Sequence, residues 1–163
     1  MAELQPIEAA LEALLADVAP LSTEQVALDG AAGRVLAEPV TATLDVPPFD
    51  NSAMDGYALR AMDAGKRLPV SQRIAAGSTA RPLVAGTCAR IFTGGQIPPG
   101  ADCVVMQERV TEENGEALIH ADVPEGDNVR LQGRDVRQGD VLLNAGERLE
   151  AAALGHLAGQ GIT

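Results

Sequence analysis

Between Leu44 and Asp140 the sequence alternates short strand-like runs with turns that contain glycine or proline. Runs of about four to eight residues with recurrent breakers leave no room for long helices. The Asn114-Gly115 pair between the last two runs is a strong hairpin signal. This region is therefore predicted to form a β-rich, barrel-like lobe. The predicted strands are Val70–Ala75, Thr87–Phe92, Cys103–Val110 and Ala117–Ala121.

The two ends of the chain have a different pattern. Helical spacing of apolar residues predicts a first helix from Ile7 that ends near Pro20, and an Ala/Leu-rich segment predicts a last helix over Glu150–Gly159, with Gly159 or Gly161 as its C-cap. Between residues 23 and 44 we expect a short strand, a helical turn from about Asp29 and an extended run. Residues 139–149 are expected to form a strand pair around a turn.

The predicted fold class is mixed α+β, with the β-rich lobe inserted into a small discontinuous α/β linking domain. Residues 1–45 and 142–163 would form the linking domain, and residues 46–141 the inserted lobe. A last helix that runs directly to the end of the chain suggests a fragment of a longer protein.

Composition excludes several classes of function. The formal net charge is −11, which argues against nucleic-acid backbones and anionic membrane surfaces as partners. Aromatic residues make up only 2% of the chain, so platforms for stacking bases are scarce. The two cysteines have no metal-binding spacing. We find neither a signal peptide nor a transmembrane run, and expect a cytoplasmic protein.

The segment "PPFDNSAMDGYALR", Pro47 to Arg60, concentrates polar and aromatic residues. Its prolines stiffen the approach, and its Asp, Asn and Ser side chains favour tight turns. Two interpretations stay open: a loop that caps the lobe, anchored by Phe49, Met54 and Tyr57, or the edge of a functional site. An EF-hand calcium loop is excluded, because Ala53 and Met62 occupy places that need acidic residues.

Two further segments could carry chemistry. In "RIFTGGQIPPGAD" the Thr93-Gly94-Gly95 turn is either an ordinary turn or a nest of N–H groups for an anion. In "NVRLQGRDVRQGD" three arginines, Arg130, Arg134 and Arg137, surround Asp135. That cluster is either a solvated turn with weak ion pairs or a site that orients Asp135 and attracts an anion.

Taken together, these segments resemble the N-terminal region of the molybdopterin molybdenumtransferase family, also called MoeA, which includes the E domain of gephyrin. The resemblance rests on "LDVPPFDNSAMDGYALR", "AGTCARIFTGGQIPPGADCVVMQERV" and "NVRLQGRDVRQGDVLLNAGERL", in this order. It implies insertion of molybdenum from molybdate into adenylylated molybdopterin, with release of AMP. The pterin-binding domains of the family would lie beyond Thr163. Glu150 departs from the Thr or Ser frequent at that helix start, which affects capping only.

Residue by residue, the resemblance implies catalytic roles for Asp55, Thr93 and Asp135. Asn51, Ser52 and Gly94 would contact substrate. The family depends on Mg²⁺, and Asp55 and Asp135 would hold the ion or handle protons, since hard oxygen ligands suit it. Arg134 and Arg137 could offset the local negative charge.

The family resemblance also implies a homodimer that binds a small-molecule pterin, whereas this chain alone is expected to be inactive. The alternative is a non-catalytic dimerisation or interaction module of the same family, in which the three segments are structural loops.

Overall fold

The computed structural model describes residues 6–120 and 122–163. Within these residues the chain forms two α-helices, ten short strands and three 3₁₀ turns, so the mixed α+β class is confirmed. The helices are α1 (Ile7–Ala16) and α2 (Ala151–Gly159). The strands are β1 (Val40–Thr41), β2 (Asn51–Ser52), β3 (Gly56–Leu59), β4 (Arg67–Ile74), β5 (Cys88–Ile91), β6 (Cys103–Met106), β7 (Val110–Glu113), β8 (Glu116–Ile119), β9 (Val129–Arg130) and β10 (Val141–Leu143).

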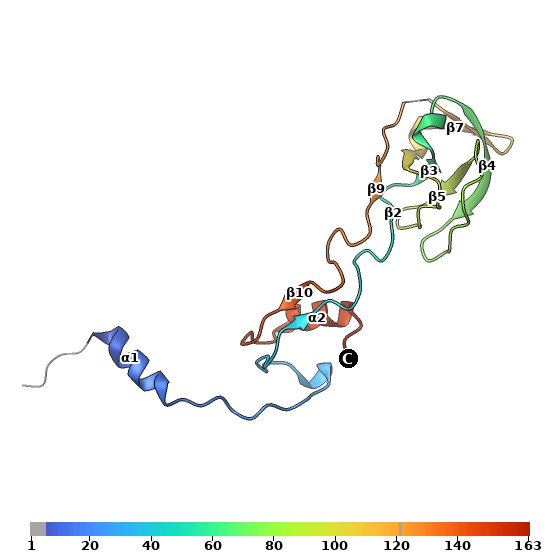
Figure 1. The fold of residues 1–163 in the computed structure, drawn as a ribbon. Helices are drawn as coiled ribbons and strands as arrows, with labels where there is room; N and C mark the ends of the chain where they lie inside the picture. The colour runs from blue at the N-terminus through green and yellow to red at the C-terminus, as the bar shows by residue number, and fades with distance from the viewer. Residues whose placement is uncertain (1–5, 121) are drawn as a thin grey trace, which may run out of the picture.

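Six strands form one curled sheet in the order β6-β3-β5-β4-β8-β7, which gives the lobe its half-barrel shape (Figure 1). Neighbouring strands are antiparallel except β4 and β5, which run parallel. Strand β3 is the central element of the site described below, since it pairs with β5 on one side and β6 on the other.

The lobe packs apolar side chains on both faces of this sheet. All four residues of β3 are buried, and they alternate between two clusters because successive side chains point to opposite faces. Tyr57 and Leu59 belong to one cluster together with both cysteines, whereas Ala58 belongs to the other. The cysteines are therefore small core residues, and burial raises the pKa of each thiol to about 12.

The predicted strands of the lobe correspond to β4, β5, β6 to β7, and β8. The Asn114-Gly115 hairpin is confirmed: both residues have positive φ, and Glu113 pairs with Glu116 across the turn. The predicted strand Cys103–Val110 is wrong in one respect, because a 3₁₀ turn at Gln107–Arg109 divides it into β6 and the start of β7. Ala121, the predicted end of the last strand, lies outside the described residues.

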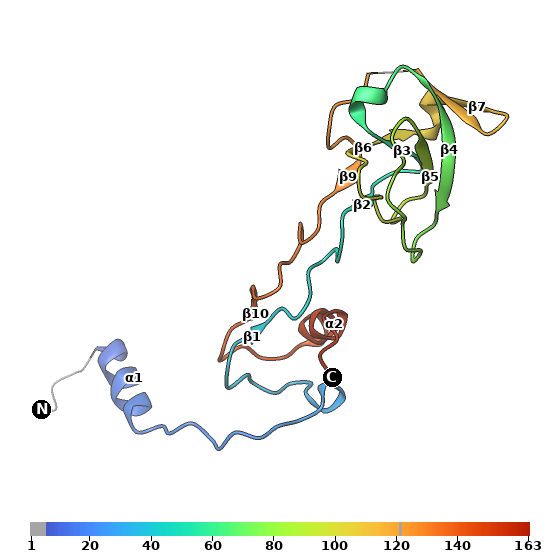
Figure 2. The ribbon, with the colours of Figure 1, turned by 45° about the vertical axis from the view of Figure 1, so that its right-hand side comes forward.

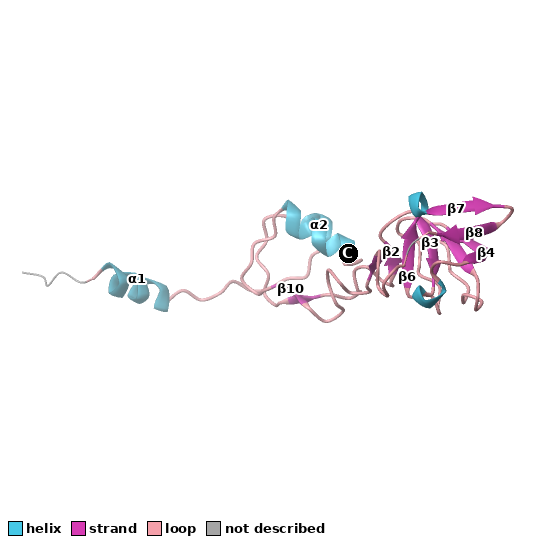
Figure 3. Ribbon diagram, turned by 90° about the horizontal axis from the view of Figure 1, so that it is seen from above, coloured by secondary structure: helices cyan, strands magenta, loops and turns pink. Residues whose placement is uncertain are grey.

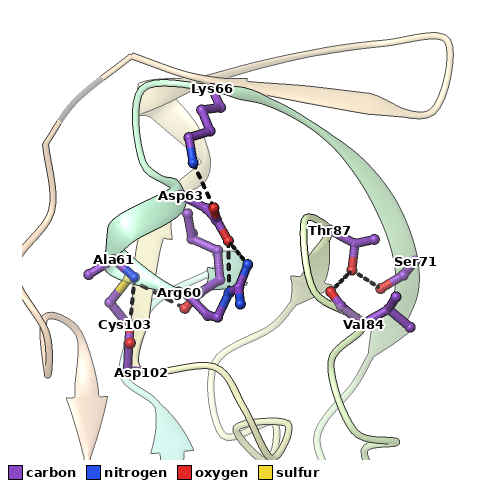
Figure 4. A network of polar contacts seen from close by, with 10 residues as sticks. Arg60, Ala61, Asp63, Lys66, Ser71, Val84, Thr87, Asp102 and Cys103 are labelled. Carbon is purple, nitrogen blue, oxygen red and sulfur yellow. Dashed lines mark hydrogen bonds and ion pairs between the residues drawn. The ribbon is translucent and has the colours of Figure 1, made fainter.

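Beyond β3 the chain turns through a compact polar network (Figure 4). Asp63 is buried and accepts hydrogen bonds from Arg60 Nε and Lys66 Nζ, each at 2.8 Å. The carboxylate of Asp102 accepts a hydrogen bond from the backbone N–H of Ala61 at 2.7 Å. These contacts fix the turn that leads from β3 to β4, on the side of the lobe where β6 begins.

The segments from the two ends of the chain pair with each other. Strand β1 pairs antiparallel with β10, and Val35 forms a bridge with Arg148. The expected strand pair within residues 139–149 is therefore wrong: each half of that segment pairs with the N-terminal segment 34–41 instead. The pairing between the two ends of the chain is favoured over a local hairpin because α2 then covers the apolar residues of both segments. These residues pack in a cluster around Ala31, Leu149 and Leu157.

Helix α2 begins and ends close to the predicted residues. It ends in a Schellman motif, with Gly161 at φ 72° and the N–H of Ile162 bonded to the carbonyl of Leu157 at 3.2 Å. Gly161, rather than Gly159, is thus the capping glycine. Glu150 occupies the N-cap and makes no side-chain capping hydrogen bond.

Helix α1 lies apart from the rest of the molecule in two views (Figures 1 and 2). It ends at Ala16, earlier than predicted, and none of its residues is buried. Residues 18–27 form no regular element, so the short strand predicted near residue 23 is wrong. No helix in the described part of the chain has the length and apolar character needed to cross a membrane.

The segment between β1 and β2 and the segment between β9 and β10 run side by side from the lobe to the paired ends of the chain (Figures 2 and 3). They are held in register by a bridge between Val46 and Val136 and by the pairing of β2 with β9. The carboxylate of Asp45 accepts hydrogen bonds from Gln132 Nε2 at 2.7 Å and from the N–H of Gln138 at 2.8 Å. The predicted domain boundaries at residues 45 and 142 stay a prediction.

Candidate functional site

The segment from Pro47 to Arg60 enters the lobe through β2 and β3. Ser52 is fully buried; its hydroxyl donates to the carbonyl of Met54 at 2.5 Å and accepts from the N–H of Met54 at 3.3 Å. Asn51 is also buried, and its amide donates to the carbonyl of Phe49 at 3.3 Å. Both side chains hold the loop, and their proposed contacts with substrate stay a prediction.

The three expected anchors of this loop behave differently. Tyr57 lies in the core, and its hydroxyl donates a hydrogen bond to Glu112. Phe49 is half-buried, whereas Met54 is 39% exposed. Anchoring is therefore due mainly to Tyr57 and to the backbone hydrogen bonds of the loop.

Gly56, directly after Asp55, permits the close approach of β3 to β6. A Cβ atom at this position would lie 1.9 Å from the carbonyl oxygen of Val105. Only glycine fits this contact, since real Cβ atoms essentially never come so near to backbone. The glycine thus fixes where Asp55 leaves the sheet.

Asp55 and Thr93 form the central contact of the site. Oδ1 of Asp55 accepts two hydrogen bonds from Thr93, one from the backbone N–H at 2.8 Å and one from the hydroxyl at 2.7 Å. Asp55 precedes β3 and Thr93 follows β5, and β3 pairs with β5. The sheet register therefore brings together two of the three predicted catalytic residues.

The electrostatics of the site keep Asp55 charged. The two hydrogen bonds from Thr93, and the nearby positive charge of Arg90, lower the pKa of this carboxyl despite its partial desolvation. No described residue donates a hydrogen bond to Oδ2 of Asp55, so that oxygen can accept a ligand. At neutral pH the residue is an acceptor, suited to a cation or to a donor group on a substrate.

The Thr93-Gly94-Gly95 turn uses its own N–H groups within the protein. The N–H of Thr93 binds Asp55, that of Gly94 binds the carbonyl of Ser52 at 2.8 Å, and that of Gly95 binds the carbonyl of Phe92 at 2.8 Å. An anion nest would need these groups free. The ordinary-turn interpretation is thus favoured, and a substrate contact of Gly94 would use other atoms.

Asp135 lies elsewhere, on the segment that connects the lobe to the paired ends. Its N–H donates to the carbonyl of Val46 at 2.9 Å, and its side chain is exposed. Hydrogen bonds from Gln138 and Gln132, and then the charge of Arg137, lower the pKa of the neighbouring Asp45. No hydrogen bond or ion pair joins Asp135 to Asp55 or Thr93 in the described residues, and its catalytic role stays a prediction.

Arg90 lies beside the pair and was not among the site residues predicted from the sequence. Its Nη1 donates to the carbonyl of Gly56 at 2.8 Å, and its Cζ lies 4.4 Å from the centre of the Phe92 ring. The sequence held a signal for this contact: Arg90 and Phe92 are two residues apart on the predicted strand Thr87–Phe92, so their side chains were expected on one face.

Other features of the described residues lie away from this pair. A cavity of about 310 Å³ is lined by Val105, Met106, Arg109, Val123, Asp127 and Asn128, and it includes neither Asp55 nor Thr93. Residues 6–120 and 122–163 contain no group of three or more His, Cys, Asp or Glu side chains that could hold a metal ion.

The protein thus combines two parts: a half-barrel lobe in which Thr93 donates two hydrogen bonds to a charged Asp55, and a small unit covered by helix α2. Paired segments join the two, and this combination points to one family. Residues 5–161 match the family model described as the MoeA N-terminal region, domains I and II. The chain belongs to this family, so the resemblance inferred from its three segments is confirmed.

Curated relatives and solved structures agree with the family. The chain is 42% identical over 158 residues to the molybdopterin molybdenumtransferase of Synechococcus elongatus and 39% identical over 147 residues to that of Haemophilus influenzae. These matches cover 90% and 88% of the chain, but only 39% and 36% of the relatives. A crystal structure of the molybdopterin biosynthesis MoeA protein from Pyrococcus horikoshii OT3 matches with a TM-score of 0.86 at 38% identity, covering 98% of this chain and 45% of that one.

Proposed function

We propose that this chain supplies the N-terminal part of an enzyme of molybdenum cofactor biosynthesis, which inserts molybdenum from molybdate into adenylylated molybdopterin and releases AMP. The observation that carries the proposal is the Asp55 carboxylate held by two hydrogen bonds from Thr93. It is supported by the names of the curated relatives.

In this proposal Asp55 works as a charged group rather than as a proton donor. Its lowered pKa makes it ionised at neutral pH. The substrates are anions, and a bare carboxylate would repel them unless a cation lies between. The two hydrogen bonds from Thr93 hold the carboxylate through Oδ1 and leave Oδ2 available to a ligand.

Mg²⁺ fits this donor set. The ion prefers oxygen ligands and usually binds through one or two carboxylates together with substrate phosphates. Oδ2 of Asp55 offers one such ligand, whereas Asp135 lies apart from it on the segment that connects the lobe to the paired ends, so its proposed part as a second ligand rests on the family resemblance alone. When bound, the ion would supply charge stabilisation at the oxygens of the substrate.

A complementation experiment tests the proposal. This chain would replace the matching N-terminal region of the Synechococcus elongatus relative, and the chimera would be expressed in bacteria that lack their own molybdenumtransferase. We expect the chimera to restore a molybdenum-dependent enzyme activity, and Asp55→Ala to abolish it while the protein stays folded. Asp122→Asn, an exposed aspartate of the same lobe, is the control. A folded Asp55→Ala chimera with normal activity would contradict the proposal.

A non-catalytic role in assembly is the second candidate. It is favoured by the apolar residues of α1, since Ile7 is 83% exposed, Leu14 is 74% exposed and Leu15 is 59% exposed. Under this alternative Asp55→Ala would leave the chimera active, whereas removal of residues 1–20 would inactivate it.

We also propose that the complete enzyme is a homodimer in the cytoplasm, and that this chain alone is inactive. Light scattering measures the molar mass of this chain and so tests whether it dimerises. A monomeric mass would show that dimerisation of the complete enzyme needs further parts of it. AMP release from adenylylated molybdopterin by the chain alone would contradict the proposal that it is inactive.

A further inference from the structure

We propose that Arg90 is a positioning residue for the Asp55–Thr93 pair, and that its guanidinium holds the strand ends carrying both residues in their active geometry. The inference deepens the proposed function and rests on it. It assigns to Arg90 no contact with substrate, only the placement of Asp55 and Thr93.

Arg90 donates hydrogen bonds at the ends of three strands beside the pair. Its Nη1 donates to the carbonyl of Gly56, next to Asp55, at 2.8 Å and to the carbonyl of Ile91 at 2.9 Å. Its Nη2 donates to Oε1 of Gln107 at 2.6 Å. The N–H of Gln107 in turn donates to the carbonyl of Asp55 at 3.0 Å. One side chain thus ties the ends of β3, β5 and β6 together.

The sheet register explains why the guanidinium can do this. Tyr57 on β3 pairs with Arg90 on β5, and the two side chains lie on one face, with Cζ of Arg90 5.3 Å from the centre of the Tyr57 ring. The ring of Phe92, one residue before Thr93, lies 4.4 Å from the same Cζ. Two aromatic contacts and three hydrogen bonds fix the plane of the fork, which a lysine ammonium cannot reproduce.

Arg73 provides a matched control on the same face. It pairs with Arg90 across β4 and β5, and its Cζ lies 4.6 Å from the same Phe92 ring. Its side chain makes no hydrogen bond or ion pair within residues 6–120 and 122–163. Arg73→Met therefore removes a cation and a stacking contact near the site without releasing a strand end.

The first measurement uses this chain alone and is independent of activity. The amide of Thr93 is followed by NMR hydrogen exchange in Arg90→Lys and Arg73→Met. Since a net hydrogen bond contributes about 1 kcal/mol, we expect Arg90→Lys to accelerate exchange by roughly fivefold to tenfold and Arg73→Met to leave it unchanged. Unchanged exchange in a folded Arg90→Lys variant would overturn the inference.

The second measurement uses the chimera with the Synechococcus elongatus relative. We expect Arg90→Lys to lower kcat by roughly tenfold to a hundredfold with an almost unchanged KM for the pterin, because misplaced groups affect the transition state. Three results would each overturn the inference. Arg90→Lys could keep full activity, it could raise KM without lowering kcat, or Arg73→Met could lower kcat by as much as Arg90→Lys does. Failure of the proposed function can be told apart from failure of this inference. If the proposed function is wrong, the Asp55→Asn chimera stays active, while hydrogen exchange at Thr93 still reports whether Arg90 holds the strand ends.

Discussion

Oδ1 of Asp55 accepts hydrogen bonds from both the backbone N–H and the hydroxyl of Thr93, at 2.8 and 2.7 Å. The two residues are far apart in sequence and meet because β3 and β5 pair. Short side chains that project from paired strand ends are held by the sheet itself, so the geometry of the pair needs little further ordering when a ligand binds.

The first prediction concerns the pKa of Asp55. Thr93→Val removes the hydroxyl donor but keeps the backbone N–H, which is the larger cause of the lowered pKa. We expect the pKa to rise in the variant and yet to stay below the ordinary value for aspartate. Titration of the Asp55 carboxyl carbon by NMR measures it; a pKa that falls or does not move would contradict the assignment.

The same shift has a consequence for stability. Because folding lowers the pKa of Asp55, its contribution to stability is present above the pKa of the unfolded chain and is lost as pH falls through the folded-state value. The carboxylate is open to solvent, so the contribution is small.

The second prediction concerns Tyr57, the only tyrosine in a chain without tryptophan. Burial, and then the hydrogen bond and charge of Glu112, raise its pKa to about 12. We expect Glu112→Gln to lower this pKa while burial keeps it above that of free tyrosine. Ultraviolet absorbance against pH reports on this one phenol.

Glu113→Gln is the matched control, since Glu113 is the next residue of β7 and is exposed. An equal shift in both variants would show that general charge, and not the bond to Glu112, is responsible. The stability linked to Tyr57 is present below the pKa of the unfolded chain and is lost as pH rises towards 12.

The third prediction concerns Gly56. Gly56→Ala places a methyl group 1.9 Å from the carbonyl oxygen of Val105, and backbone must shift to admit it. We expect a loss of about 3–5 kcal/mol in the free energy of unfolding, measured with urea, or a lobe that does not fold. Gly30→Ala is the control, because no atom other than those of its own chain neighbours lies within 4 Å of the added Cβ. Wild-type stability of Gly56→Ala would refute the close approach of β3 and β6.

The lobe could be predicted largely from local signals. Asn114-Gly115 requires positive φ at both positions and fixed the hairpin, and glycine and proline turns fixed the ends of the other strands. The pairing of segment 34–41 with residues 139–149 could not be predicted, because each half looks like part of a local hairpin. Only burial against α2 selects the long-range partner.

The candidate site shows the same limit. Asp55 and Thr93 were found from the segments that resemble the family, but their contact depends on the register of β3 and β5, which local propensity does not specify. Arg90 was overlooked because an arginine on a strand is most often a solvated side chain. Its role becomes visible only when Gly56, Gln107 and the Phe92 ring are in place around it.

The most direct test of the proposed role of Asp55 is the rate of AMP release from adenylylated molybdopterin and molybdate by the purified chimera with Asp55→Asn. Asparagine keeps the shape of the side chain and an oxygen that can accept from Thr93, but it removes the charge and replaces the free acceptor Oδ2 with an NH₂ donor. We predict a rate lower by roughly 10²–10³-fold, as expected when a preorganised electrostatic group is lost. A correctly folded Asp55→Asn chimera that releases AMP as fast as the unmodified chimera would contradict the central claim.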